Sequence, residues 1–108
     1  MANNYKFKGV ALATTDQTNL VMAGTGETLI VKSVIITNNT ANTPTITLDV
    51  TDSSASATYM ILRTHALTAN TSEELLTKPL VLEAGDILKA TMSSTDSVHI
   101  AVSYLAIT

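Results

Sequence analysis

The stretch Thr45-Ile46-Thr47-Leu48-Asp49-Val50-Thr51 decides the fold class of this chain. Its apolar and polar residues alternate without a break, and a period of two places Ile46, Leu48 and Val50 on one face of a β-strand. The threonines lie on the opposite face, where the branched β-carbon favours extended backbone and the hydroxyl remains in water. The stretch therefore predicts a strand with one buried and one exposed face.

Much of the remaining chain repeats this pattern. It predicts about eight short strands, which we expect at residues 5–13, 19–23, 28–38, 45–51, 58–64, 80–82, 87–92 and 98–107. Turn-forming residues separate these segments at the spacing typical of an antiparallel sandwich or barrel. Parallel pairing is not expected, because no segment could form the crossover helix that it needs. Residues 73–77 fit either one helical turn or a brief strand.

The segment 28–38 favours a two-sheet sandwich over a closed barrel. It is the longest apolar stretch and is rich in β-branched residues, so it is either a central strand covered on both faces or a strand that changes face at a bulge. We therefore predict an all-β fold, a single antiparallel β-sandwich that is jelly-roll-like and has no substantial helix. Residues 1–108 are expected to form one domain, with residues 1–4 as a flexible N-terminal arm that can order on a neighbouring subunit.

The last predicted strand, 98–107, has a clear register because its side chains alternate between two faces. We expect the buried face to hold Val98, Ile100, Val102 and Tyr104. The opposite face, which meets solvent or a partner, then holds His99, Ala101 and Ser103.

The composition predicts a folded protein with a weakly charged surface. Hydrophobic residues make up 45% of the 108 residues, which excludes disorder, but charged residues only 14%. The solvent face must then be built largely from Thr, Ser and Asn. Such a surface does little to repel another protein surface, and we interpret it as a sign of a protein that works in an assembly.

The charge balance argues against nucleic acid as a partner. The formal net charge is −3, Arg63 is the only arginine, and the five lysines are scattered along the chain. A nucleic-acid interface needs clustered Lys and Arg to neutralise phosphates, and a single-strand binder also needs stacking aromatic residues. The sequence has neither.

The sequence also lacks cysteines, a signal peptide and any membrane-spanning apolar segment. It contains no cysteine, so no disulfide and no thiolate metal site can hold the fold. Residues 1–6 lack the apolar core of a signal peptide, and no apolar run reaches the length of about twenty residues that spans a bilayer. We expect synthesis in a cytoplasm and no membrane partner.

Catalysis is not expected. The chain has many hydroxyl groups, but only His65 and His99 could serve as the oriented base that nucleophilic catalysis requires. His99 is expected to face solvent, and His65 is expected to be a turn residue at the end of a strand beside Arg63. No catalytic residue is assigned to either position.

Two acidic pairs could each hold a calcium ion if a loop carbonyl joined them: Asp49 with Asp52, and Glu83 with Asp86. Turn chemistry explains both pairs better, because Asp caps turns through the neighbouring backbone and Gly85 permits a positive φ. We assign no metal site and no cofactor, and a structural ion at either pair stays an open alternative.

The order of several segments resembles a known group of proteins. The segments are an N-terminal strand followed by Ala13-Thr14-Thr15, then residues 29–38, 47–54, 79–90 and 102–105. This arrangement is similar to the small β-sandwich virion structural proteins of tailed phages, especially podophages and cyanophages. The resemblance covers nearly the whole chain, but its motifs are strand and turn patterns rather than catalytic signatures.

The resemblance implies a non-enzymatic role on the virion. Proteins of this kind are capsid decoration (cement) proteins, or small components of head fibres and tails. The implied partner is the phage major capsid protein or another virion protein, together with further copies of the chain in a homo-oligomer. The alternative is a receptor- or glycan-binding module of a fibre or tail, for which Tyr59 and Tyr104 would be the candidate aromatic contacts.

Overall fold

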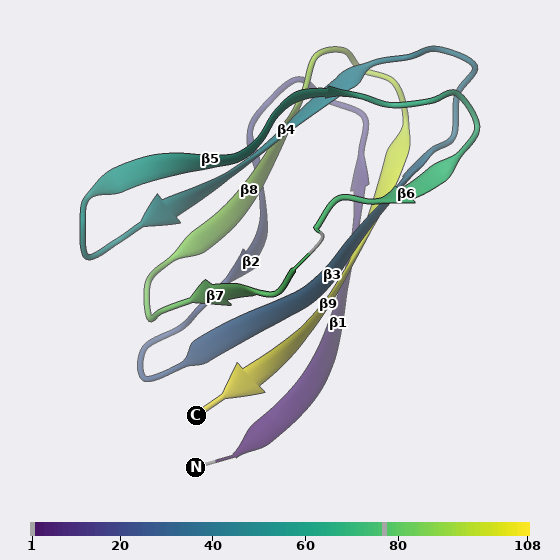
Figure 1. Cartoon of the computed structure of the whole chain (residues 1–108). Helices are drawn as coiled ribbons and strands as arrows, with labels where there is room; N and C mark the ends of the chain where they lie inside the picture. The colour runs from purple at the N-terminus through teal and green to yellow at the C-terminus, as the bar shows by residue number, and fades with distance from the viewer. Residues whose placement is uncertain (1, 77) are drawn as a thin grey trace.

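The computed structural model describes residues 2–76 and 78–108, which fold into strands joined by loops (Figure 1). Within these residues there are nine strands. They are β1 (Asn3–Leu12), β2 (Thr18–Met22), β3 (Thr28–Asn38), β4 (Thr45–Asp52), β5 (Ala57–Ala66), β6 (Ser72–Glu74), β7 (Leu80–Leu82), β8 (Ile87–Met92) and β9 (Val98–Ile107). No helix in the described part of the chain is long and apolar enough to cross a membrane.

The strands form two antiparallel sheets. Sheet A has the order β1-β9-β3-β6, with β7 also paired to β3, and sheet B has the order β2-β8-β4-β5. β6 and β7 both pair along the same edge of β3, one after the other, and so occupy a single strand position. Each sheet is therefore four strand positions wide. The chain crosses between the sheets at almost every connection, and β4 and β5 form the hairpin within sheet B. This is the strand order of a jelly roll, and the predicted all-β sandwich is confirmed.

The predicted strands agree closely with the observed ones. The ranges 28–38, 80–82, 87–92 and 98–107 are the same, and the others differ by one or two residues at an end. The ambiguous segment 73–77 contributes to a short strand, since Ser72–Glu74 forms β6 and pairs with β3. Thr77, the end of that segment, lies outside the described residues.

A bulge divides β3 into two halves. Its register on β9 shifts between Val31 and Ser33, so that one extra residue, Lys32, stands opposite no partner. Leu29 and Val31 are buried before the bulge, and the buried residues after it have the opposite parity, beginning with Val34. Of the two alternatives for this segment, the strand that changes face at a bulge is therefore the observed one.

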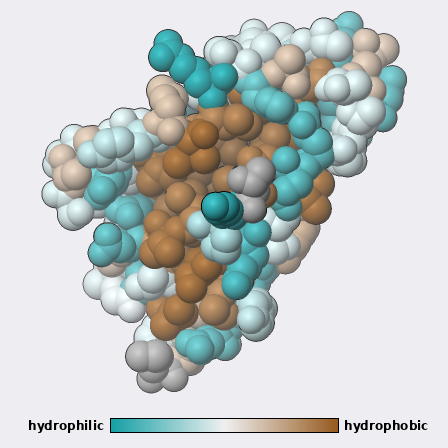
Figure 2. All heavy atoms as spheres, viewed as in Figure 1, coloured by the Kyte–Doolittle hydropathy of each residue, from teal (hydrophilic) through white to brown (hydrophobic). Residues whose placement is uncertain are grey.

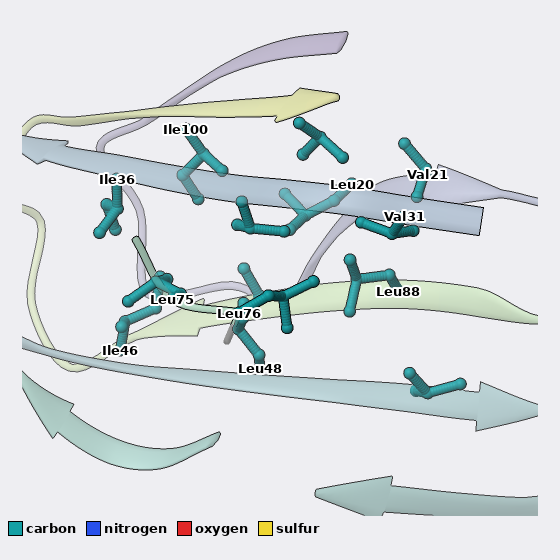
Figure 3. Close-up of a cluster of buried hydrophobic side chains, with 14 of the residues drawn as sticks. Leu20, Val21, Val31, Ile36, Ile46, Leu48, Leu75, Leu76, Leu88 and Ile100 are labelled. Carbon is teal, nitrogen blue, oxygen red and sulfur yellow. The ribbon is translucent and has the colours of Figure 1, made fainter. Parts of the chain in front are cut away.

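The core lies between the sheets and is closed by the connection from β6 to β7. Leu75 and Leu76 are consecutive and both buried, which strand alternation does not allow but a loop does. Figure 3 shows Leu75 between Ile36 of sheet A and Ile46 of sheet B, with Leu76 next to Leu48 of sheet B. They fill the space that the short strands β6 and β7 leave at this side of the sandwich.

The apolar interior comes close to the surface on that side. Figure 2, viewed as in Figure 1, shows hydrophobic residues gathered in a band over the region where β3, β4, β7 and β8 lie, with hydrophilic residues around it. Leu80 at the start of β7 is partly buried against the core, and the next residue, Val81, is exposed. The two short strands thus cover this side of the core incompletely.

The N-terminal residues extend the sheet. Asn3 and Asn4 belong to β1 and pair with Ile107 and Ala106 of β9, and Ala2 exchanges two backbone hydrogen bonds with Thr108. The expected arm of residues 1–4 is therefore not separate from sheet A at residues 2–4, because β9 is long enough to pair with them. Met1 lies outside the described residues.

The register of β9 predicts a sharp contrast between two neighbouring residues. Val98, Ile100 and Val102 are buried, whereas His99 and Ser103 are exposed, as expected from the alternation. The substitution Ile100→Ala should lower the free energy of unfolding by about 2–5 kcal/mol, the usual loss for a buried isoleucine with its cavity. His99→Ala should cost well under about 1 kcal/mol. Urea denaturation of the two variants measures the difference, and equal losses would mean that the register of β9 is wrong.

Candidate functional site

The two histidines lie in different surroundings. His99 is exposed on β9, as predicted, with Ala11 of β1 and Thr37 of β3 as its cross-strand neighbours. His65 is not a turn residue: it lies within β5, where its Nε2 is 2.9 Å from the Glu73 Oε2 of β6. This contact joins sheet B to sheet A. His65 is thus held by a carboxylate from the other sheet, and it lies on the inner face of sheet B beside buried Ile46.

The first acidic pair has two separate sets of partners. Asp49 is buried on β4, and its Oδ2 accepts a hydrogen bond of 3.0 Å from the Gln17 amide. Asp52 uses one oxygen to accept from the backbone N–H groups of Ser54 (3.1 Å) and Ala55 (3.2 Å). The Asp52 contacts are those of a capped turn between β4 and β5.

The second pair shows turn chemistry in a buried setting. Asp86 is buried, and its two oxygens accept backbone hydrogen bonds from Ser53 (3.0 Å) and Glu83 (2.9 Å). Gly85 has a φ of 91°, and a Cβ built on it would come within 2.8 Å of the Ser53 Oγ. Asp86 therefore connects the β4–β5 turn with the β7–β8 turn. Among the described residues, no three His, Asp or Glu side chains gather where they could hold a metal ion.

The opposite end of the sandwich is held by a second polar network. The buried Asn38 donates to the Asn42 carbonyl (2.8 Å) and accepts from the Thr40 N–H (3.0 Å). Asn42 in turn donates to Asp96, which also accepts from the Ser94 hydroxyl. The hydrogen bonds from Ser94 and Asn42 hold the pKa of Asp96 below its usual value. This stabilisation is present above the pKa of the unfolded chain and is lost as the pH falls through the lowered pKa of the folded protein.

The outward-facing side of sheet A, which we call the outer face, is the strongest candidate for a binding surface. Alternation and cross-strand pairing place on it the odd-numbered residues of β1 and β9, with Ile30, Ser33, Ile35 and Thr37 of β3 and Val81 of β7. Tyr5 is 80% exposed, Phe7 68% and Ile35 43%. Large apolar side chains that face water on one sheet indicate a surface that meets a partner.

A shallow hollow of about 390 Å³ lies within this face. Gly9, Ala101 and Ile35 form one cross-strand row through it, and the small size of the first two residues leaves the space. Phe7 borders the hollow so closely that a Cβ on Gly9 would be 3.3 Å from the Phe7 ring. His99 borders it on another side. The lining is mainly apolar, and it suits the binding of an apolar group better than it suits chemistry.

Sequence reasoning found the strands of this face but not the face itself. The signal was present in β1, where Tyr5 and Phe7 alternate with Lys6 and Lys8. The alternation shows that aromatic and charged residues point to opposite sides. It does not show that the aromatic side faces outward, because that depends on the pairing of β1 with β9.

Comparison with known proteins shows a similar fold in unrelated settings. No family model and no curated protein sequence matches the chain. Among solved structures, that of the infectious bursal disease virus Gx strain matches with a TM-score of 0.61 and 13% identity, over 96% of this chain and 32% of that one. The Drosophila NLP core, whose structure provides insight into pentamer formation and histone binding, matches with a TM-score of 0.55 and 17% identity, over 91% and 96%.

A third match is the CBM22-1-GH10 part of xylanase 10B from Clostridium thermocellum, complexed with xylohexaose. Its TM-score is 0.50 with 16% identity, over 94% of this chain and 24% of that one. The capsid asymmetric unit of cyanophage Pam1 also matches, with a TM-score of 0.47 and 21% identity, over 95% of this chain and 84% of that one. At these identities the likeness shows the fold alone. The fold is thus one that occurs in a virus structure, a pentamer-forming protein and a xylanase in complex with a sugar chain.

The buried carboxylate of Asp86 leads to a stability prediction. Asp86→Ala leaves two backbone N–H groups without acceptors and should cost about 1–3 kcal/mol of unfolding free energy. Asp52→Ala is the matched control, since its turn is exposed and water can replace the lost acceptor, so it should cost less. Thermal unfolding measures both.

The same turn leads to a second prediction, that no calcium ion is bound at Asp86. Thermal unfolding curves recorded with calcium chloride and with EDTA should coincide. Stabilisation by calcium that Asp86→Ala removes would show that an ion is bound there.

Proposed function

We propose that this protein is a non-enzymatic structural protein of a phage virion, a capsid decoration protein that binds the assembled shell and stabilises it. The observation that carries the proposal is the outer face of sheet A. Exposed apolar side chains gather there on a rigid sheet, and the polar clusters elsewhere are engaged in holding turns and loops. A surface of this kind is suited to contact rather than to catalysis.

Two further observations support the proposal. The order of strand and turn segments resembles small virion proteins of tailed phages over nearly the whole chain. The fold is also similar to one found in a virus structure. Decoration would act through area, because interfaces of roughly 1,600 Å² repeated at many symmetry-related sites bind together through multivalency.

The first test is cosedimentation with phage particles. The protein should sediment with intact capsids and should not sediment with free, unassembled coat protein, because a decoration protein recognises junctions that only the shell contains. Mass spectrometry of purified virions should detect it in many copies per particle. Its absence from purified virions would overturn the proposal.

A second candidate function is glycan binding by a fibre or tail module. The structure favours Tyr5 over the two tyrosines selected from sequence: Tyr5 is the most exposed aromatic residue and lies on the same face as Phe7. Tyr104 packs against the core, so that its removal would disturb folding, and Tyr59 is exposed on the edge strand β5. Sugars stack on exposed aromatic faces of this kind.

The glycan alternative makes a distinct prediction. A glycan array should show binding that Tyr5→Ala abolishes and Tyr59→Ala leaves unchanged, with both variants folded by circular dichroism. Binding that survives Tyr5→Ala, or an array with no signal, would count against this role. Shell binding without glycan binding would leave decoration as the better account.

A further inference from the structure

The outer face of sheet A combines an exposed aromatic residue, Phe7, with a hollow that its ring borders. Phe7 is 68% exposed, and the hollow beside it is floored by Gly9 and Ala101. We propose that this face binds the same face of a second copy of the chain across a two-fold axis, with Phe7 of each copy seated in the hollow of the other. The proposal concerns the isolated protein. Because the dimer covers the face that supports the proposed shell binding, the two contacts are alternatives, and a copy that binds a shell through this face would leave the dimer.

In a two-fold interface, Phe7 of each copy can enter the hollow of the other copy at the same time. In such an interface, if residue i of one copy contacts residue j of the other, then j also contacts i. Phe7 lies on β1 and Ala101 on β9, two positions apart in register. A rotation that brings Phe7 over the partner's hollow therefore brings the partner's Phe7 over this one. Aromatic residues in well-packed pockets are the groups that contribute most to such interfaces.

The charge of the face permits a copy to approach. An interface between identical surfaces brings like residues close together, so a face with a net charge repels its own copy. Strand pairing places Glu74 of β6 opposite Ile35 of the outer face, and Lys32, the bulge residue of β3, carries a charge of the opposite sign. The Glu74 carboxylate also accepts hydrogen bonds from Ser33 and from the Val34 N–H. The two lysines of β1, Lys6 and Lys8, alternate with Tyr5 and Phe7 and belong to the other side of the strand.

The size of the face is sufficient for a concentration-dependent dimer. Strands of ten or eleven residues are about 33 Å long at about 3.3 Å per residue, and four strand positions at about 4.8 Å give a width of about 19 Å. The face therefore measures about 600 Å², and a pair of copies that overlapped completely would bury about 1,200 Å². That is the lower end of the range for specific interfaces. The two outer faces would stack about 10 Å apart, as packed sheets do.

Sedimentation velocity over a range of concentrations tests the proposal. The wild-type chain should change from monomer to dimer as the concentration rises. Phe7→Glu should raise the dissociation constant at least tenfold, because it removes the aromatic anchor and places two carboxylates in the interface. Met22→Glu and Met60→Glu are the matched controls. These methionines are 56% and 55% exposed, lie on the outward-facing side of sheet B, and should leave the dissociation constant unchanged.

A mixing experiment tests the reciprocal geometry. Phe7→Glu and Ala101→Lys should each weaken dimerisation when alone. A mixture of the two variants should dimerise more strongly than either, because the introduced carboxylate then meets the introduced ammonium at one of the two contacts and the native pair remains at the other. Circular dichroism should show the same fold for all variants.

Three results would overturn the inference: a wild-type chain that stays monomeric at all concentrations, equal weakening by Phe7→Glu and Met60→Glu, or a mixture no stronger than its components. The outcome for the proposed shell-binding function is measured separately, by sedimentation with capsids. A monomer that still sediments with capsids would leave decoration standing, whereas a dimer that does not sediment with them would overturn decoration and leave the interface intact.

Discussion

The bulge at Lys32 in β3 is the constraint on which the rest of the molecule depends. In a regular strand, Leu29 and Val31 would share their face with Ser33 and Ile35. The extra residue reverses the parity, so that Val34 and its even-numbered successors enter the core while Ile35 turns outward. One inserted position thus completes the hydrophobic interior and creates the apolar surface behind it. Without it, sheet A would bury a serine and expose several of the residues that now hold the two sheets together.

The sequence was sufficient to predict where the strands lie and that they form a sandwich, because period-two alternation is a local signal. The register of β9 follows from Val98, His99 and Ile100 alone, and the turn at Asp52 follows from the residues beside it. Leu75 and Leu76 show the limit of this reasoning. They are consecutive and both buried, and only the shortness of β6 and β7 explains why a loop must fill that space.

The candidate site was less predictable because it is assembled from distant parts of the chain. Gly9 and Ala101 form the floor of the hollow although ninety-odd positions separate them, and neither residue is distinctive by itself. His65 and Glu73 are close in sequence, but their contact depends on the chain crossing from sheet B to sheet A between them. In both cases the decisive information is strand pairing, which a pattern of residue types does not specify. The expectation of a weakly charged surface, by contrast, came from composition alone and needed no knowledge of strand pairing.

The position of β9 has a consequence for how the chain can fold during synthesis. This strand lies between β1 and β3 in sheet A, yet it follows every other strand in the sequence. A growing chain that has not reached residue 98 therefore holds two long strands, β1 and β3, with no strand between them, and the backbone N–H and C=O groups on their facing edges stay unpaired. Sheet A cannot join β1 to β3 until residues 98–107 are available to pair with both. The chain that still lacks β9, rather than the finished one, is therefore the species most exposed to aggregation.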